Sequence, residues 1–178
     1  MNMKAEMAES KVKDNPMREV KIVKVLLSAG GIDQELAKSK KLLEMVSGMK
    51  AQIIASRKRI PDFGVRPGLE VGTRITLRGD AAIDVLKRIL GAIDNKIQES
   101  SVADNGFSFG IKEYIDIPGM EYQRDIGIRG FNITVVFARP GLRVKERKIK
   151  TGSLGNKQKV RKEEVIKFME DAFKTQFI

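Results

Sequence analysis

The chain has 178 residues, with 34 Lys and Arg, 23 Asp and Glu and no His, for a net charge of +11. The absence of Cys excludes disulfides and cysteine metal sites. No apolar run approaches the roughly 20 residues of a membrane span, so no membrane partner is expected. Residues 1–14 mix Lys and Glu with small residues, which predicts a flexible tail rather than a signal peptide and hence a cytoplasmic protein. The remainder, 15–178, has a length typical of one domain.

The positive charge favours a polyanionic partner. Lys and Arg neutralise phosphates and release the counter-ions that surround a nucleic acid or an acidic membrane. A basic protein without such a partner stays an alternative, because net charge governs association and not the fold. The position of the charges is therefore the more informative observation.

The first ordered elements follow from local signals. Asn15 precedes Pro16, which predicts extended backbone at the entry into order. The Val-, Ile- and Leu-rich run 19–29 predicts a strand that is apolar on both faces, and therefore a central one. A helix follows, which Asp33 can cap and which ends near Gly48. A short strand is expected at about 51–55.

Three later segments share one alternating pattern: 71–78, 107–111 and 131–138. Each places large apolar residues on one face and small, polar or basic residues on the other. Helical spacing predicts a helix from Asp80 that includes Ile97, and a last helix over about 162–177. Helices therefore alternate with strands along the chain.

These elements predict an α+β fold, a two-layer sandwich in which helices pack on one face of a largely antiparallel or mixed β-sheet. The other face stays open and carries Arg74, Thr76 and Arg78. A polar sheet face is usually only solvated. Together with the net charge, it also fits a platform for nucleic acid.

The densest charge lies in residues 143–162, before the last helix. Nine Lys and Arg stand there against one acid, Glu146, and Gly and Ser in the middle indicate that the segment does not fold alone. Such a segment suits contacts along a phosphate backbone, although a solvated segment is the alternative. The candidate phosphate contacts are Arg143, Lys145, Arg147, Lys148, Lys157 and Lys159.

A loop rich in Pro and Gly, residues 56–68, is the second candidate. Loops longer than about 12 residues are usually functional or disordered. Arg57, Lys58 and Arg59 stand together in it. Phe63 follows, and it either stacks on a base or packs into the core.

Catalysis is not expected. Without His and Cys, the commonest general base and the commonest covalent thiol are missing. The stretch Gly152 to Lys157 fails as a phosphate-binding loop, since its glycines are too close together and Gln158 follows the Lys. No cofactor, metal or small-molecule substrate is predicted.

Several stretches resemble one protein family when they are taken in order. They are 15–19 (Asn-Pro-Met-Arg-Glu), 63–66 (Phe-Gly-Val-Arg), 76–79 (Thr-Leu-Arg-Gly), 107–111 (Phe-Ser-Phe-Gly-Ile), 126–128 (Ile-Gly-Ile), 139–141 (Arg-Pro-Gly), 151–152 (Thr-Gly) and 162–164 (Lys-Glu-Glu). The chain is similar over about 15–177 to the 5S rRNA-binding protein of the large-subunit central protuberance, universal ribosomal protein five, in its archaeal and eukaryotic form. Each stretch alone is weak, but the ordered combination is specific.

The resemblance implies a structural constituent of the large ribosomal subunit. Its implied partners are 5S rRNA, 23S-type rRNA, P-site tRNA, other central-protuberance proteins and a small-subunit head protein at an intersubunit bridge. The implied 5S rRNA contacts are Asn15, Met17, Arg18, Phe63, Arg66, Arg74, Thr76 and Arg78. By the same likeness, Arg57, Lys58 and Arg59 face the tRNA and the subunit interface, with Phe63 and Arg66 at the base of their loop. A general basic nucleic-acid-binding protein that is not tied to the ribosome is the alternative.

The chain departs from the family in two places. Met49-Lys50-Ala51 stands where many relatives carry Gln-Lys-Pro or Gln-Thr-Pro, so no RNA contact is assigned to Met49. Arg161 stands where many have Ser or Thr before Lys-Glu-Glu. Loss of that helix cap is expected to fray the first turn by about 1 kcal/mol.

Overall fold

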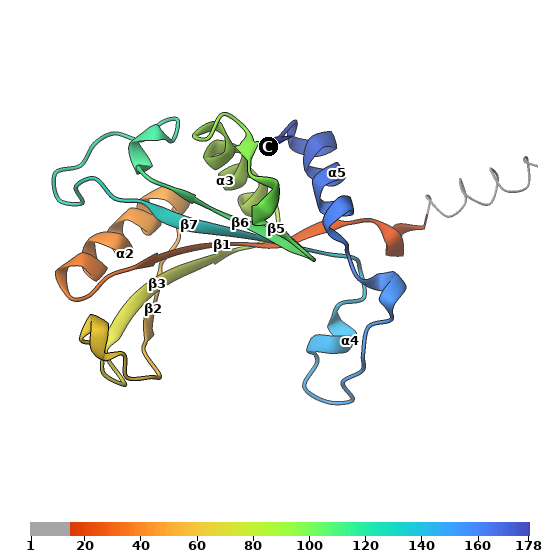
Figure 1. The fold of residues 1–178 in the computed structure, drawn as a ribbon, viewed down its shortest axis with the longest axis horizontal. Helices are drawn as coiled ribbons and strands as arrows, with labels where there is room; N and C mark the ends of the chain where they lie inside the picture. Colours follow the sequence, from red (N-terminus) through yellow and green to blue (C-terminus); the bar gives the residue numbers. More distant parts are fainter. Residues whose placement is uncertain (1–14) are drawn as a thin grey trace, which may run out of the picture.

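The computed structural model describes residues 15–178, so the predicted tail 1–14 lies outside the described part (Figure 1). Its main sheet has six strands in the order β2-β3-β1-β7-β6-β5, and every neighbouring pair is antiparallel. The strands are β1 (Lys21–Gly30), β2 (Gln52–Ala55), β3 (Glu70–Leu77), β5 (Val102–Ala103), β6 (Gly106–Ile111) and β7 (Phe131–Ala138). The helices are α2 (Gln34–Ser47), α3 (Asp80–Gly91), α4 (Arg143–Glu146) and α5 (Lys162–Phe173).

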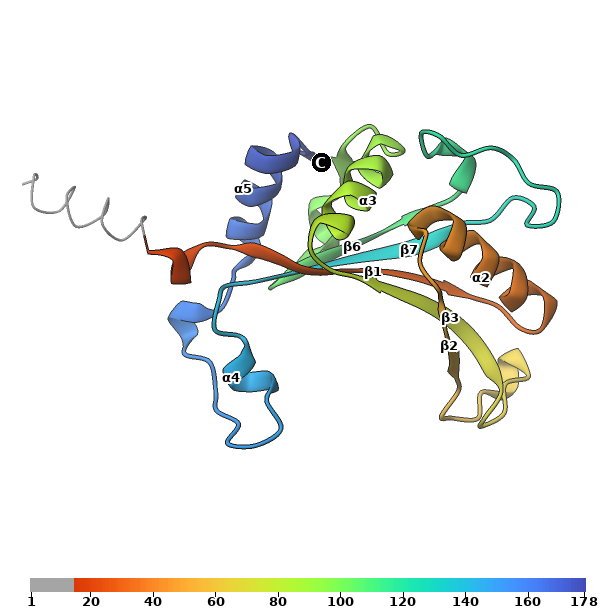
Figure 2. The same ribbon diagram turned by 180° about the vertical axis from the view of Figure 1, so that it is seen from behind.

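Helices α2, α3 and α5 lie together on one face of the sheet, which confirms the predicted two-layer α+β architecture (Figures 1 and 2). The core fills the space between the layers, with Leu27 from β1, Leu86 from α3 and Phe137 from β7 almost wholly buried. Val165 and Met169 on α5 complete it. Strand β1 lies between β3 and β7. It is therefore central, as its two apolar faces predicted.

The strand register arranges the opposite face in rows. One row runs across five strands and the next across four. The first row is Gln52, Arg74, Ser28, Asn132 and Gly110, and the second is Thr76, Leu26, Thr134 and Ser108. Apart from Leu26 these residues are small, polar or basic, and none is acidic. This surface, defined by the two rows, is called the open face below.

The predicted helix from Asp80 is shorter than expected. It ends at Gly91, and the chain then turns through the left-handed backbone of Asp94 and Asn95. Ile97 is therefore not helical but lies in β4 (Lys96–Ile97), which pairs in parallel with β8 (Gln176–Phe177). The apolar spacing of Ile97 continued the helical pattern by coincidence.

The last helix also ends early, at Phe173 instead of about 177. Lys174 adopts the left-handed conformation, so that the chain end can pair with β4. At the start of α5 the Glu164 carboxylate accepts a hydrogen bond from the Arg161 N–H at 3.1 Å. This contact replaces part of what a Ser or Thr cap would supply.

The predicted cap of the first long helix is wrong. Asp33 occupies the N-cap position of α2, but its side chain makes no capping hydrogen bond. Its positive φ of 48° directs the backbone away from the extended geometry that N-cap residues usually adopt. No helix in residues 15–178 combines the length and apolar character needed to cross a bilayer.

Candidate nucleic-acid interface

Two basic segments project from the sheet on the side away from the helices (Figures 1 and 2). One is the basic loop, residues 56–68, between β2 and β3. The other is the basic arm, residues 143–162, which joins β7 to α5 and contains α4. Both views place the open face between them. The two densest charge clusters of the sequence therefore flank one surface.

The basic loop is a hairpin-like excursion. Backbone hydrogen bonds close its base, from Ser56 to Leu69 at 2.8 Å and from Gly68 to Ser56 at 2.9 Å. A second closure pairs Ile60 with Val65. Arg57, Lys58 and Arg59 lie exposed between the two closures. Within the described residues no carboxylate forms an ion pair with these three cations.

Phe63 lies at the tip of this loop and not at its base. It belongs to a single 3-10 turn, Pro61–Phe63, beyond the Ile60–Val65 bridge. Its side chain is 72% exposed, so it does not pack into the core. Arg66 follows the bridge on the returning limb and is exposed. The expectation that both residues lie at the base is wrong for Phe63, because the bridge turns the chain at 61–64.

The basic arm carries nine cations and is anchored by one further Arg. Of the nine, only Lys162 forms an ion pair within residues 15–178, with Glu99 at 2.8 Å. Arg139, at the end of β7, donates from its guanidinium to the Lys157 carbonyl and to the Glu164 carboxylate. This contact holds the arm against α5. The six arm residues predicted to bind phosphate are all exposed.

The N-terminal turn adjoins the base of this arm. The Asn15 side chain accepts a hydrogen bond from the Met17 N–H at 3.0 Å and so caps the 3-10 turn Pro16–Arg18. The Gln158 amide donates to the Met17 carbonyl at 3.2 Å and to the Pro140 carbonyl at 2.6 Å. Arg18 is exposed. Residues far apart in the sequence are thus brought to one end of the sheet.

The remaining predicted residues lie on β3. Arg74 is exposed on the open face, where its Nε donates to the Gln52 carboxamide at 3.2 Å. Thr76 is half-buried in the next row, and Arg78 is exposed just after the Leu77–Val25 pair. The sequence reasoning missed Gln52 and Ser28 as members of this face. Only the strand register places them there.

Comparison with known proteins bears on this surface. Residues 70–168 match the model of the C-terminus of the ribosomal uL5 family. The uL5 protein of Nanoarchaeum equitans is 40% identical over 168 residues, which cover 93% of this chain and 99% of that protein. The uL5 proteins of Sulfolobus acidocaldarius and Methanobrevibacter smithii are 39% and 37% identical over 170 and 167 residues, with 94% and 92% of this chain and 95% and 98% of theirs covered.

The chain belongs to the uL5 family. It is a structural, non-enzymatic constituent of the large ribosomal subunit, of the archaeal type, and it works in the cytoplasm with ribosomal RNA and ribosomal proteins. The resemblance that the sequence motifs carry is confirmed by these relatives. For a uL5 protein, an acid-free sheet face between two basic projections is a surface suited to RNA.

Proposed function

We propose that this uL5 protein binds 5S rRNA through its open face, with residues 15–178 acting as one RNA-binding unit. The observation that supports this most directly is the acid-free open face between the basic loop and the basic arm (Figure 1). Small side chains such as Ser28 and Thr134 let a phosphate–sugar backbone approach the sheet closely. Hydroxyl and amide groups along the rows supply hydrogen bonds to ribose and phosphate.

Different parts of the surface have different roles in this proposal. The N-terminal turn (Asn15, Met17, Arg18) and the β3 residues (Arg74, Thr76, Arg78) bind 5S rRNA, and Phe63 and Arg66 contact it from the basic loop. The arm cations contact rRNA phosphates, including those of 23S-type rRNA, and other central-protuberance proteins lie alongside. Because phosphate contacts position without reading bases, selectivity comes from RNA shape.

Arg18→Ala and Arg78→Ala are each expected to weaken 5S rRNA binding about fivefold at roughly 0.15 M salt, since each removes one phosphate contact. Both side chains are exposed and make no ion pair within the described residues, so the thermal unfolding midpoint is expected to stay unchanged. Filter binding at fixed salt measures the loss. The matched control is Lys41→Ala, an exposed Lys on α2 in the helical layer. Equal affinity of all three variants would remove the RNA face from the proposal.

The basic loop has a separate role in our proposal: Arg57, Lys58 and Arg59 contact P-site tRNA and face the small-subunit head at an intersubunit bridge. Figure 1 places this loop at the other end of the sheet from the arm. Its three neighbouring cations have no carboxylate partner within residues 15–178. They therefore stay available to a second polyanion.

Replacing Arg57, Lys58 and Arg59 together by Ser is expected to leave 5S rRNA affinity within about twofold, because the 5S contacts lie elsewhere on the surface. In assembled ribosomes the same variant is expected to bind P-site tRNA several times more weakly. Binding of labelled tRNA to reconstituted ribosomes measures this. A variant that loses 5S rRNA binding instead would contradict the division of roles.

The overall proposal is tested by 5S rRNA binding against tRNA and duplex DNA competitors over a salt series. Selective binding that survives competition supports a 5S rRNA interface. Equal and steeply salt-dependent binding to all three would instead favour a general basic nucleic-acid-binding surface, since charge alone does not discriminate between polyanions.

A further inference from the structure

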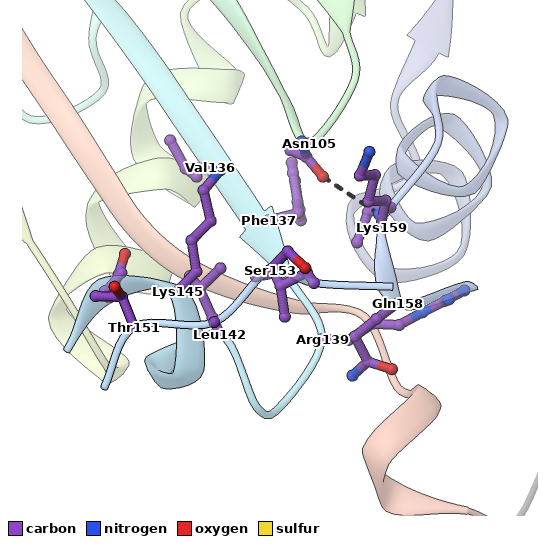
Figure 3. Close-up of a pocket in the computed structure, with 15 residues that line it drawn as sticks. Asn105, Val136, Phe137, Arg139, Leu142, Lys145, Thr151, Ser153, Gln158 and Lys159 are labelled. Atoms are coloured by element: carbon purple, nitrogen blue, oxygen red, sulfur yellow. Dashed lines mark hydrogen bonds between the residues drawn. The ribbon is translucent and has the colours of Figure 1, made fainter. Parts of the chain in front are cut away.

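A hollow of about 750 Å³ lies where the open face meets the basic arm (Figure 3). One wall is the end of β7, with Val136 and Phe137, and the other is the arm from Leu142 to Val160. The turn before β6 closes a third side with Asn105. Its volume falls within the range of about 300–1,000 Å³ that is typical of small-molecule sites in proteins. It is large enough for one nucleotide.

The floor of the hollow is apolar and continues the open face. Val136 lies opposite Lys24 and Gly106 in the strand register, one row beyond Leu26 and Thr134. Leu142 and Leu154 add apolar surface from the arm. A nucleobase removed from its stack needs such a surface to replace the lost stacking contacts.

Asn105 presents a fixed hydrogen-bond donor at the hollow. Its carbonyl accepts from the Phe137 N–H at 2.7 Å, and its backbone is held at a φ of 66°. Its side-chain Oδ1 accepts from the Val160 N–H at 3.2 Å, the contact dashed in Figure 3. The Nδ2 group thereby has a fixed direction and no acceptor among the described residues.

Gln158 presents the complementary acceptor. Its Nε2 donates to the Met17 and Pro140 carbonyls, which leaves Oε1 without a donor in residues 15–178. An amide donor and an amide acceptor are the groups that proteins use to read the edge of a base. Both are oriented by contacts within the protein before any ligand arrives, which lowers the entropy cost of binding.

The rim is positively charged. Lys145 and Lys159 line the hollow, and Glu146 is its only acidic residue. Neither lysine forms an ion pair within the described residues. Arg139 also lines it, although its charge is balanced by Glu164. An apolar floor with free cations above it fits a base joined to a phosphate better than it fits an apolar peptide side chain.

We infer that this hollow takes a single unstacked nucleotide of the bound 5S rRNA, with the base on the Val136 and Phe137 floor and its phosphate against Lys145 and Lys159. The inference rests on the proposed 5S rRNA interface, because the hollow continues the open face. It adds a site at which the protein recognises one unpaired nucleotide, beyond contacts to the RNA backbone.

Ser153→Trp tests the inference by filling the hollow without changing charge. Ser153 lines the hollow and lies at its centre in Figure 3. We expect 5S rRNA affinity to fall about tenfold, the size expected when one stacked base is displaced. The dependence of log affinity on log salt is expected to stay unchanged, because no phosphate contact is lost.

The matched control is Ile149→Trp, which adds a ring of the same size on the same arm. Ile149 is 76% exposed and does not line the hollow. Its affinity is expected to stay within about twofold of wild type, since an exposed ring displaces no bound base. A Ser153→Trp variant that binds 5S rRNA as tightly as this control would overturn the inference.

Cross-linking provides a test that needs no bulky substitution. The chain has no Cys, so Ser153→Cys carries a single thiol for an azidophenacyl photo-cross-linker. Irradiation with 5S rRNA is expected to modify one or two adjacent unpaired nucleotides, as mapped by primer extension. Ile149→Cys is expected to give a broad pattern. A broad pattern from both positions would contradict a nucleotide site.

These outcomes separate the two levels of the argument. If the wild-type protein showed no selective 5S rRNA binding, the proposed function itself would fail. If wild type bound selectively while Ser153→Trp bound equally well, only the nucleotide site would fail. A hollow that serves a neighbouring ribosomal protein would give this second result, with Ser153→Cys cross-links to protein in reconstituted subunits and none to RNA.

Discussion

Replacing Arg143, Arg147 and Lys148 together by Gln should lower the affinity for 5S rRNA roughly 100-fold at about 0.15 M salt. The three side chains are exposed on the basic arm and form no ion pair within residues 15–178. Each released phosphate contact also returns one set of counter-ions to the RNA. The losses therefore multiply, which makes this the largest binding effect expected of any surface change.

The salt series identifies the cause of the loss. The slope of log affinity against log salt should become shallower by about 2 to 3 units, close to one unit for each phosphate contact removed. Titration of fluorescent 5S rRNA at four or five salt concentrations measures this slope. Gln keeps most of the side-chain length and its helix propensity, so α4 is expected to remain folded.

Lys41, Lys87 and Lys167 replaced by Gln form the matched control. All three are exposed and lie on α2, α3 and α5, in the layer that covers the other face of the sheet. The control makes the same change in net charge, so it removes the same long-range attraction but none of the proposed contacts. If both triple variants lost affinity equally, net charge alone would explain binding and the arm would have no special role.

Local patterns predicted the sheet well. The alternation in β3, β6 and β7 needs only neighbouring residues, because side chains of a strand point alternately to its two faces. The burial of Ile75, Ile133 and Val135 confirms that each apolar face lies against the helices. The position of β1 at the centre of the sheet followed from the same kind of local reasoning.

Helix ends and the composition of the site depend on distant contacts. Both α3 and α5 end where the chain turns so that β4 and β8 can pair, a contact between residues about 80 positions apart. The exposed tip position of Phe63 follows from the Ile60–Val65 bridge. Gln52 joins the open face only through its pairing with Arg74. No pattern within one segment contains this information.

The hollow is the part that sequence reasoning did not reach. Its polar groups come from Asn105 and Gln158, which lie 53 positions apart and belong to no recognised motif. The arm was predicted correctly as a charged segment, but its anchoring depends on Arg139 and Glu164. A possible signal was Asn105-Gly106, a pair typical of tight hairpin turns.

Gly106→Ala is expected to destabilise the protein by about 3 kcal/mol, at the upper end of what overpacking costs. A Cβ atom at this position would lie far inside van der Waals contact with the Val135 carbonyl oxygen. That oxygen belongs to the backbone of β7 in the middle of the sheet, so no side-chain rotation can relieve the clash. Urea denaturation followed by circular dichroism measures the change in unfolding free energy.

Gly110→Ala, in the same strand, is the matched control. Its Cβ would meet only the Asn132 Oδ1 atom, at 3.0 Å, and that side chain on the open face can rotate away. Since Ala also restricts the unfolded chain more than Gly does, the stability of this variant is expected to stay within about 0.5 kcal/mol of wild type. Equal stability of the two variants would show that the approach of β6 to β7 is not tight.

The two glycines also separate stability from binding. Displacing β6 at Gly106 would move the adjoining Asn105, so a folded fraction of Gly106→Ala should lose the hydrogen bond from Val160 to the Asn105 side chain and with it the fixed donor of the hollow. Gly110 lies on the open face beside Asn132, away from this turn. With both variants compared below their unfolding transitions, weaker 5S rRNA binding by Gly106→Ala alone would connect the close packing of β6 and β7 to recognition of RNA.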